Sequence, residues 1–90
     1  MTSPEEARLK RIRMRAWRRG TKEMDLVLGH YADEMLPKLS PAALDALESL
    51  MNENDQDLMA WMLGQFPAPA EHAALLDELK AFTKARLERG

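Results

Sequence analysis

The sequence predicts an all-α protein, a compact single-domain bundle of about five short helices. Apolar residues recur at spacings of three and four, start and stop signals divide the chain into helical segments, and no segment shows the alternation typical of a strand. Short connections between the segments favour antiparallel neighbours. We expect residues 1–90 to form one helical domain, in which residues 1–7 can remain a loose N-terminal end.

The first helix is predicted from residue 4 to about residue 18. Ser3 suits the N-cap, Pro4 the first helical position and Glu6 the capping box. Three apolar residues share one face: Leu9, Ile12 and Ala16. Four arginines share another: Arg8, Arg11, Arg15 and Arg18. Trp17 falls between the two faces, and we expect it to be partly exposed.

The second helix is predicted from Lys22 to about Leu36, because Pro37 discourages continuation. Its apolar residues follow the spacing of a buried stripe: Met24, Val27, Leu28, Tyr31 and Met35. The third helix is expected to begin at Ser40 and Pro41. Its inward-facing residues are Leu44, Leu47, Leu50 and Met51.

The fourth helix is predicted from about Gln56 to Gln65, with Asn54 as N-cap and Asp57 in the first turn. Residues 66–69, Phe-Pro-Ala-Pro, form an extended linker because two prolines restrict the backbone there. The fifth helix is predicted over residues 70–89. Its apolar stripe is Leu75, Leu76, Leu79 and Phe82.

Charge is distributed unevenly along the chain. The formal net charge is only −2, yet residues 1–25 carry eight Lys and Arg against four Asp and Glu, whereas residues 26–90 carry five against eleven. A basic arm on an acidic body is a candidate interaction surface. Its partner could be nucleic acid, an anionic lipid surface or an acidic protein patch.

The sequence lacks the residue sets that catalysis or metal binding requires. There is no cysteine, and the four glycines are isolated, so thiol chemistry and a glycine-rich phosphate loop are excluded. His30 and His72 lie far apart in sequence, and each is expected on a helix surface. Asp55 and Asp57 lack the calcium-loop pattern. We therefore expect neither an enzyme nor a metal protein.

No targeting or membrane-spanning segment is expected. The N-terminal residues are polar and acidic, unlike a signal peptide, and no apolar run approaches the roughly 20 residues of a transmembrane helix. We expect a cytoplasmic protein that does not insert into membranes.

The segment Arg19-Gly20-Thr21-Lys22-Glu23-Met24-Asp25, which we call the corner segment, joins the first two helices. One interpretation is ordinary helix capping: Gly20 follows a helix end with positive φ, and Glu23 and Asp25 suit the positive start of the next helix. The other interpretation is an exposed docking corner for a partner. Charge placement alone favours the first interpretation, because such placement is common at helix ends.

The corner segment also resembles the R-G-x-x-E-x-D motif of the succinate dehydrogenase assembly factor 2 family, the SdhE-type flavinylation factors. A basic helix with an aromatic residue, Trp17, precedes it and an apolar helix follows. Residues 52–61, Asn-Glu-Asn-Asp-Gln-Asp-Leu-Met-Ala-Trp, are similar to the family's acidic turn followed by Asp, a hydrophobic pair and Trp. Pro67-Ala68-Pro69 matches the hinge before the last helix. The resemblance covers residues 8–86 and favours the docking interpretation.

The resemblance implies a five-helix assembly factor that is not itself an enzyme and has no cofactor of its own. Members of this family bind the flavoprotein subunit of succinate dehydrogenase, and in some bacteria that of fumarate reductase, and promote covalent attachment of FAD to a histidine of that subunit. Carried over by motif, the docking corner is Arg19, Gly20, Glu23 and Asp25. Further partner-binding candidates are Arg15, Trp17, Asp57 and Trp61. For Asp57 and Trp61, a helix-capping acid and a core tryptophan are equally good interpretations.

Two other functions remain open from the residues alone. One is a basic-helix nucleic-acid-binding or antitoxin-type regulatory module, and the other is a structural helical adaptor. A salt-dependent DNA shift would support the nucleic-acid module, because phosphate contacts release counterions. A one-to-one complex with a large flavoprotein, without a DNA shift, would support the assembly factor, for which no nucleic-acid partner is expected.

Overall fold

The computed structural model describes residues 3–89, and this part of the chain is all-α, as the sequence predicted. Five α-helices and one short 3₁₀ helix follow in the order α1 (Pro4–Ala16), α2 (Lys22–Met35), η1 (Leu36–Lys38), α3 (Pro41–Met51), α4 (Asp55–Met62) and α5 (Ala70–Arg89). Of the expected loose end, residues 1 and 2 lie outside the described residues, and residues 4–7 form the first turn of α1.

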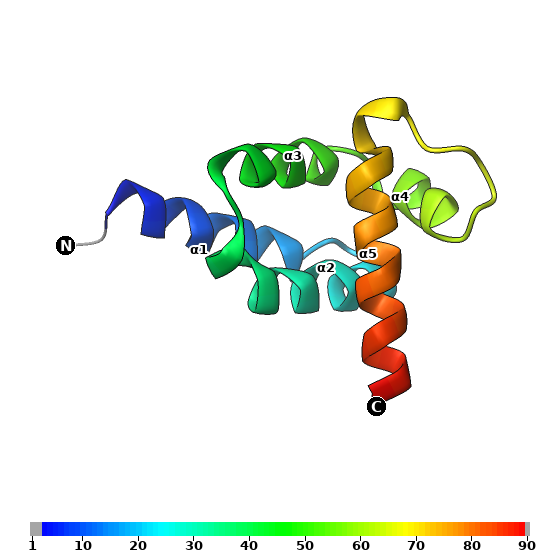
Figure 1. Ribbon diagram of the computed structural model, residues 1–90, viewed down its shortest axis with the longest axis horizontal. Helices are drawn as coiled ribbons and strands as arrows, with labels where there is room; N and C mark the ends of the chain where they lie inside the picture. The colour runs from blue at the N-terminus through cyan, green and yellow to red at the C-terminus, as the bar shows by residue number, and fades with distance from the viewer. Residues whose placement is uncertain (1–2, 90) are drawn as a thin grey trace.

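The second helix is the centre of the arrangement. It runs antiparallel to α1, and α5 crosses it (Figure 1). The third helix contacts α1 and α5, while the short α4 packs against α2 and α5 at the end of the molecule where α1 turns into α2. This topology brings the corner segment next to the turn between α3 and α4, although Arg19 lies 36 and 34 residues before its partners Asp55 and Glu53.

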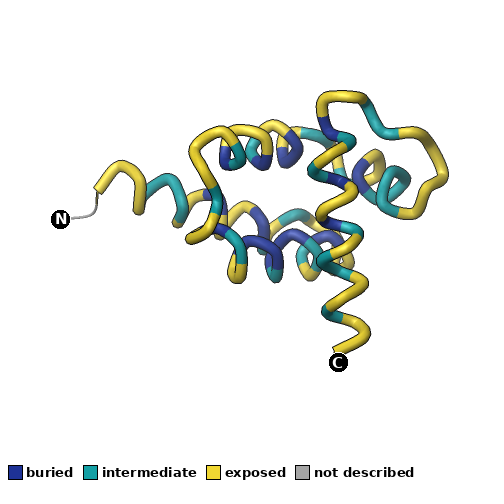
Figure 2. Tube along the Cα trace, viewed as in Figure 1, coloured by how far each residue is buried: buried dark blue, intermediate teal, exposed yellow. Residues whose placement is uncertain are grey.

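The apolar stripes predicted from spacing form the core. The turns of each helix that face its neighbours are buried, and the opposite sides are exposed (Figure 2). The most buried large side chains are Ile12, Met24, Leu28, Tyr31, Leu36, Leu47, Leu50, Met51, Leu58, Leu76 and Leu79. Burial also raises the pKa of the Tyr31 hydroxyl, which donates a hydrogen bond to Glu78.

In the part of the chain that the structure describes, four side chains cap helix N-termini by accepting a hydrogen bond from the backbone N–H three residues later. They are Ser3, Thr21, Ser40 and Asn54, with distances of 3.1, 3.4, 3.1 and 2.9 Å. Such caps satisfy N–H groups that have no partner inside the helix. Those of Ser3, Ser40 and Asn54 confirm the predicted helix starts.

Two predicted helix ends were wrong by two or three residues. The first helix ends at Ala16 rather than at Arg18, because the N–H of Arg18 donates to the Arg15 carbonyl in a tighter turn. The fourth ends at Met62 rather than at Gln65. There Gly64 has a φ of 74°, and the N–H groups of Gly64 and Gln65 donate back to the carbonyl oxygens of residues 61 and 60, which is a Schellman motif.

Trp17 and Gly29 make the closest contact between α1 and α2. Trp17 is half-buried, as expected, and its ring lies on the backbone of Gly29. A Cβ on Gly29 would lie 2.3–2.6 Å from three ring carbons of Trp17, which is closer than real contacts allow. The packing of α1 on α2 therefore requires a glycine at this position.

We expect Gly29→Ala to lower the free energy of unfolding by about 1–2 kcal/mol. Overpacking costs about 1–3 kcal/mol, and the better helix propensity of alanine offsets up to about 1 kcal/mol of that. Urea unfolding measures the change. In a Trp17→Leu background the same substitution should be close to neutral, and an equal loss in both backgrounds would contradict the steric explanation.

Candidate docking site

The corner segment consists of a tight turn, residues 19–21, and the first four residues of α2. Gly20 is exposed and has a φ of 106°, a conformation that residues with a Cβ rarely adopt. The positive φ was predicted correctly, but the predicted position directly after the helix was wrong, since α1 ends at Ala16. Gly20 therefore shapes the connection between the helices and does not cap α1.

Arg19 holds the corner segment against the turn between α3 and α4. Its Nε donates to Oδ1 of Asp55 at 2.9 Å. Its Nη1 and Nη2 donate to the carbonyl oxygens of Met51 and Glu53 at 2.5 and 2.6 Å. The side chains of Arg19 and Asp55 are only 10% and 13% exposed. The expectation of an exposed corner is thus wrong for Arg19, whose guanidinium is engaged within the protein.

Asp25 closes the same turn from the other side. Its Oδ1 accepts a hydrogen bond from the backbone N–H of Arg19 at 2.5 Å. The N–H of Asp25 in turn donates to the carbonyl of Thr21 at 3.0 Å, within the first turn of α2. Arg19 and Asp25 together therefore fix the backbone of the corner segment.

Glu23 is the exposed acid of this segment. Its side chain lines a surface groove of about 400 Å³ together with Thr21, Asp55, Gln56, Met59, Ala60 and Gln65. Within residues 3–89, the side chain of Glu23 makes no hydrogen bond or ion pair. We call this groove, with Glu23 and Gly20 beside it, the docking groove. It presents the exposed acid Glu23 of α2 next to Met59 and Ala60 of α4, while Asp55 at its edge is paired with Arg19.

The other four candidates, Arg15, Trp17, Asp57 and Trp61, all make contacts within the protein. Arg15 donates to Oδ1 of Asn52 at 3.0 Å, which ties α1 to the end of α3. Besides contacting Gly29, Trp17 lies edge-on to His30 with ring centroids 5.1 Å apart. These contacts place Arg15 and Trp17 in the packing of α1 against its neighbours.

Asp57 and Trp61 both belong to α4. The N–H of Asp57 donates to Oδ1 of Asn54, and the side-chain amide of Asn54 donates to Oδ2 of Asp57, each at 2.9 Å. This reciprocal pair matches the helix-capping interpretation of Asp57. Trp61 is half-buried against the core, and its ring lies 5.9 Å from that of His72.

The structure adds a link between the docking groove and α5 that the sequence analysis missed. His72 was expected on a helix surface, but its side chain is 3% exposed. Its Nε2 lies 2.9 Å from Oε2 of Glu53, whose carbonyl oxygen accepts from Arg19. No pattern in the sequence indicates this link, because Glu53 lies 19 residues from His72 and 34 residues from Arg19.

Glu53, His72 and Glu71 are also the group within the described chain that could hold a metal ion. Their ligand atoms lie within 4.8 Å of one another. His72 and Glu53 already contact each other, and Glu71 is largely exposed. The contact between His72 and Glu53 anchors α5 to the turn between α3 and α4.

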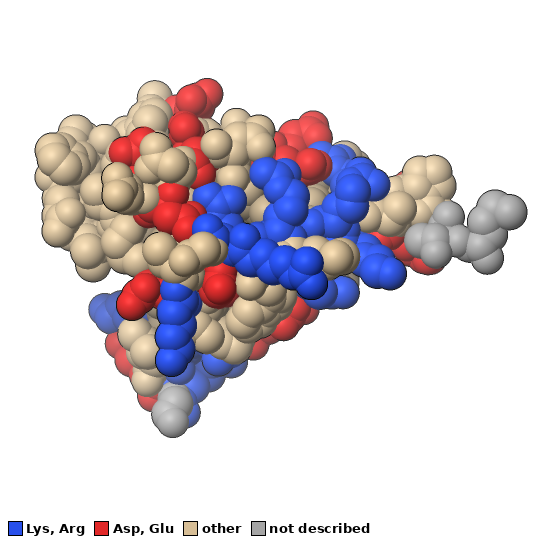
Figure 3. Space-filling model, turned by 180° about the vertical axis from the view of Figure 1, so that it is seen from behind, with Lys and Arg blue, Asp and Glu red and all other residues tan. Residues whose placement is uncertain are grey.

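Lys and Arg gather in a band over α1, beside a cluster of acids (Figure 3). The predicted basic face included Arg18, but α1 ends at Ala16, so only Arg8, Arg11 and Arg15 of that set lie on it, and Arg8 is paired within the protein. Arg8 pairs with Asp45 of α3 at 2.5 Å and with Glu48 at 2.6 Å. Hydrogen bonds to these two acids raise the pKa of the Arg8 guanidinium further.

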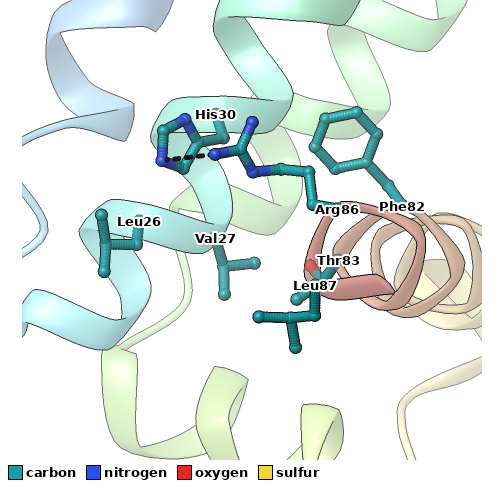
Figure 4. Close-up of a pocket in the computed structure, with 7 residues that line it drawn as sticks. All are labelled: Leu26, Val27, His30, Phe82, Thr83, Arg86 and Leu87. Carbon is teal, nitrogen blue, oxygen red and sulfur yellow. Dashed lines mark hydrogen bonds between the residues drawn. The ribbon is translucent and has the colours of Figure 1, made fainter. Parts of the chain in front are cut away.

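A second groove, of about 200 Å³, lies between α2 and the C-terminal half of α5. Figure 4 shows Leu26, Val27 and Leu87 around it, with Arg86 donating to Nε2 of His30 at 3.3 Å. None of the partner-binding residues proposed from the sequence lines this groove. It is therefore separate from the docking groove.

The fold and the site together define a small helical module with a hydrogen-bonded turn and, beside it, a partly apolar groove that carries the exposed acid Glu23. Within residues 3–89, no helix is both long and apolar enough to cross a membrane. The family model described as flavinator of succinate dehydrogenase matches residues 10–83, and the chain belongs to this family. The family inferred from the corner segment is thereby confirmed.

Relatives from bacteria and yeasts support this assignment. The FAD assembly factor SdhE of Photobacterium profundum is 35% identical, over 97% of this chain and 96% of the relative. That of Acetobacter pasteurianus is 31% identical over 74% of this chain, which spans 62% of the relative. The mitochondrial succinate dehydrogenase assembly factor 2 of Schizosaccharomyces japonicus is 34% identical over 93% of this chain and 62% of the relative.

Proposed function

We propose that this protein is an assembly factor that binds the flavoprotein subunit of succinate dehydrogenase and promotes the covalent attachment of FAD to it. The observation that carries this proposal is the family match across residues 10–83, which includes the complete R-G-x-x-E-x-D motif of the corner segment. The flavoprotein of fumarate reductase is a second client that the same docking groove could serve.

The proposed mechanism is positioning. In this mechanism the bond to FAD forms on the flavoprotein, and the assembly factor contributes binding and orientation. A partner that binds one domain arrangement of the flavoprotein more tightly increases the population of that arrangement. Holding the flavin and the accepting side chain in a reactive geometry lowers the barrier without adding a chemical group.

Within this proposal the motif residues have two different tasks. Glu23 is exposed at the docking groove, and Gly20 leaves the adjacent surface without a side chain, so these two contact the flavoprotein. Arg19 and Asp25 are positioning residues, because their hydrogen bonds hold the turn in place. Asp57 and Trp61 support the groove from α4, and Arg15 and Trp17 support it from α1.

The test is a reconstituted flavinylation assay. Apo-flavoprotein is mixed with FAD, with and without this protein, and covalent flavin is measured by fluorescence of the denatured subunit in a gel. We expect faster attachment with the protein present and a one-to-one complex in analytical size exclusion. Equal rates with and without the protein, or the absence of a complex, would refute the proposal.

A further inference from the structure

The chain has a long uncharged stretch at the end of the molecule that carries the docking groove. Residues 58–70 contain no Asp, Glu, Lys, Arg or His, although 31% of the whole chain is charged. They form most of α4 and the loop to α5. This end of the molecule is the uncharged region in Figure 3, next to the acidic cluster. Within it, Leu63 and Phe66 are 63% and 65% exposed.

Hydrogen bonds and prolines restrict the backbone that carries Leu63 and Phe66. The Schellman motif at Gly64 fixes the start of the loop, with hydrogen bonds of 3.2 and 2.9 Å. Two prolines, Pro67 and Pro69, restrict φ in the second half, and Ala68 between them packs against the core. A preorganised apolar loop loses little conformational entropy when a partner covers it.

The loop continues the surface of the docking groove. Gln65, between the two exposed apolar side chains, lines the groove together with Glu23 and Asp55. We propose that Leu63 and Phe66 are a second, apolar part of the docking surface, covered by the same flavoprotein that contacts Glu23. The inference rests on the proposed function. If the inference is correct, the flavoprotein surface that covers this loop carries an apolar patch beside a cationic group.

Charge complementarity favours the flavoprotein as the partner that covers this patch, over an anionic lipid surface and over a second copy of this chain. Glu23 is the exposed acid that borders the uncharged region in the groove, whereas Asp55 is paired with Arg19. The carboxylate of Glu23 would be repelled by an anionic lipid surface, because the membrane surface potential attracts cations. In a symmetric dimer through this patch, Glu23 of one copy would approach Glu23 of the other. A protein surface with a cation next to apolar side chains avoids both conflicts.

The experiment compares full-length variants for binding to purified apo-flavoprotein by surface plasmon resonance. We expect Leu63→Ser/Phe66→Ser to bind about tenfold or more weakly, mainly through faster dissociation, as is typical of interface anchors. The matched control is Leu87→Ser, which removes a leucine 77% exposed at the far end of α5. It should bind within about twofold of the wild type, a small change in binding free energy. Urea unfolding should be similar for all, because these side chains are exposed.

The outcomes separate this inference from the proposed function. If the wild type does not bind the flavoprotein, the proposed function fails and the inference fails with it. If the wild type binds and the double variant binds equally well, or Leu87→Ser is weakened as much, the inference alone is overturned. It is also overturned if the double substitution abolishes self-association in sedimentation velocity, or vesicle binding to phosphatidylglycerol, while flavoprotein binding persists unchanged.

Discussion

Replacing Arg19 by alanine should lower the free energy of unfolding by about 3–5 kcal/mol, the loss typical when one partner of a buried ion pair is removed. The side chain donates to Asp55 and to two carbonyl oxygens of the turn between α3 and α4, and both charged groups are almost completely buried. Alanine leaves the carboxylate of Asp55 and both carbonyl oxygens without these donors. Urea unfolding followed by circular dichroism measures the loss.

Two further variants separate the contribution of the Arg19–Asp55 ion pair from that of the hydrogen bonds to the two carbonyl oxygens. Arg19→Lys keeps the charge but cannot reach three acceptors with a planar fork, so it should recover only part of the stability. In an Asp55→Asn background, Arg19→Ala should cost less, because the buried carboxylate is gone. The difference is the coupling energy of the pair. If Arg19→Ala unfolds at the wild-type urea concentration, Arg19 is not a positioning residue.

The second large effect is expected on binding. Glu23→Gln should weaken the affinity for the apo-flavoprotein by about 30-fold or more, corresponding to about 2 kcal/mol or more, because a cation of the partner would be left desolvated without its counter-charge. Glutamine keeps the shape and removes the charge. The side chain is exposed in the first turn of α2, so the loss of stability should stay within about 0.3–1 kcal/mol, the typical helix-dipole contribution.

The matched control is Glu5→Gln. Glu5 is also an exposed acid in the first helical turn, but it lies at the start of α1, away from the docking groove. Its substitution should change stability by a similar small amount and leave flavoprotein affinity unaltered. Thermal unfolding and calorimetric titration on the same preparations decide whether Glu23 binds the flavoprotein or only stabilises α2. A lower melting temperature for Glu23→Gln with unaltered affinity would mean that Glu23 only stabilises α2.

Local features of the sequence predicted most of the fold. Helix starts depend on a capping side chain and the N–H three residues later, so Ser3, Ser40 and Asn54 could be identified without tertiary information. Core stripes depend on spacing along one helix, and Leu44, Leu47 and Leu50 are buried as predicted. Helix ends were less accurate. Arg18 was expected inside α1, but the chain leaves the helix before it.

The sequence analysis named candidate site residues but could not show how their side chains are arranged. The motif of residues 19–25 led to the correct family, because a family motif is a pattern in the sequence itself. The motif does not show which residue points outward. Arg19 and Glu23 are both charged and four residues apart, yet Arg19 is buried in the turn between α3 and α4 while Glu23 is exposed.

The sequence by itself therefore determined the class, the helix starts, the core stripes and the family. Only the tertiary structure decided that Arg19 joins two distant turns, that His72 is buried beside Glu53, and that Leu63 and Phe66 lie next to the docking groove. The physical reason is the range of the interactions. Capping and helical periodicity act within a few residues, whereas burial and ion pairing depend on which distant segments the fold brings together.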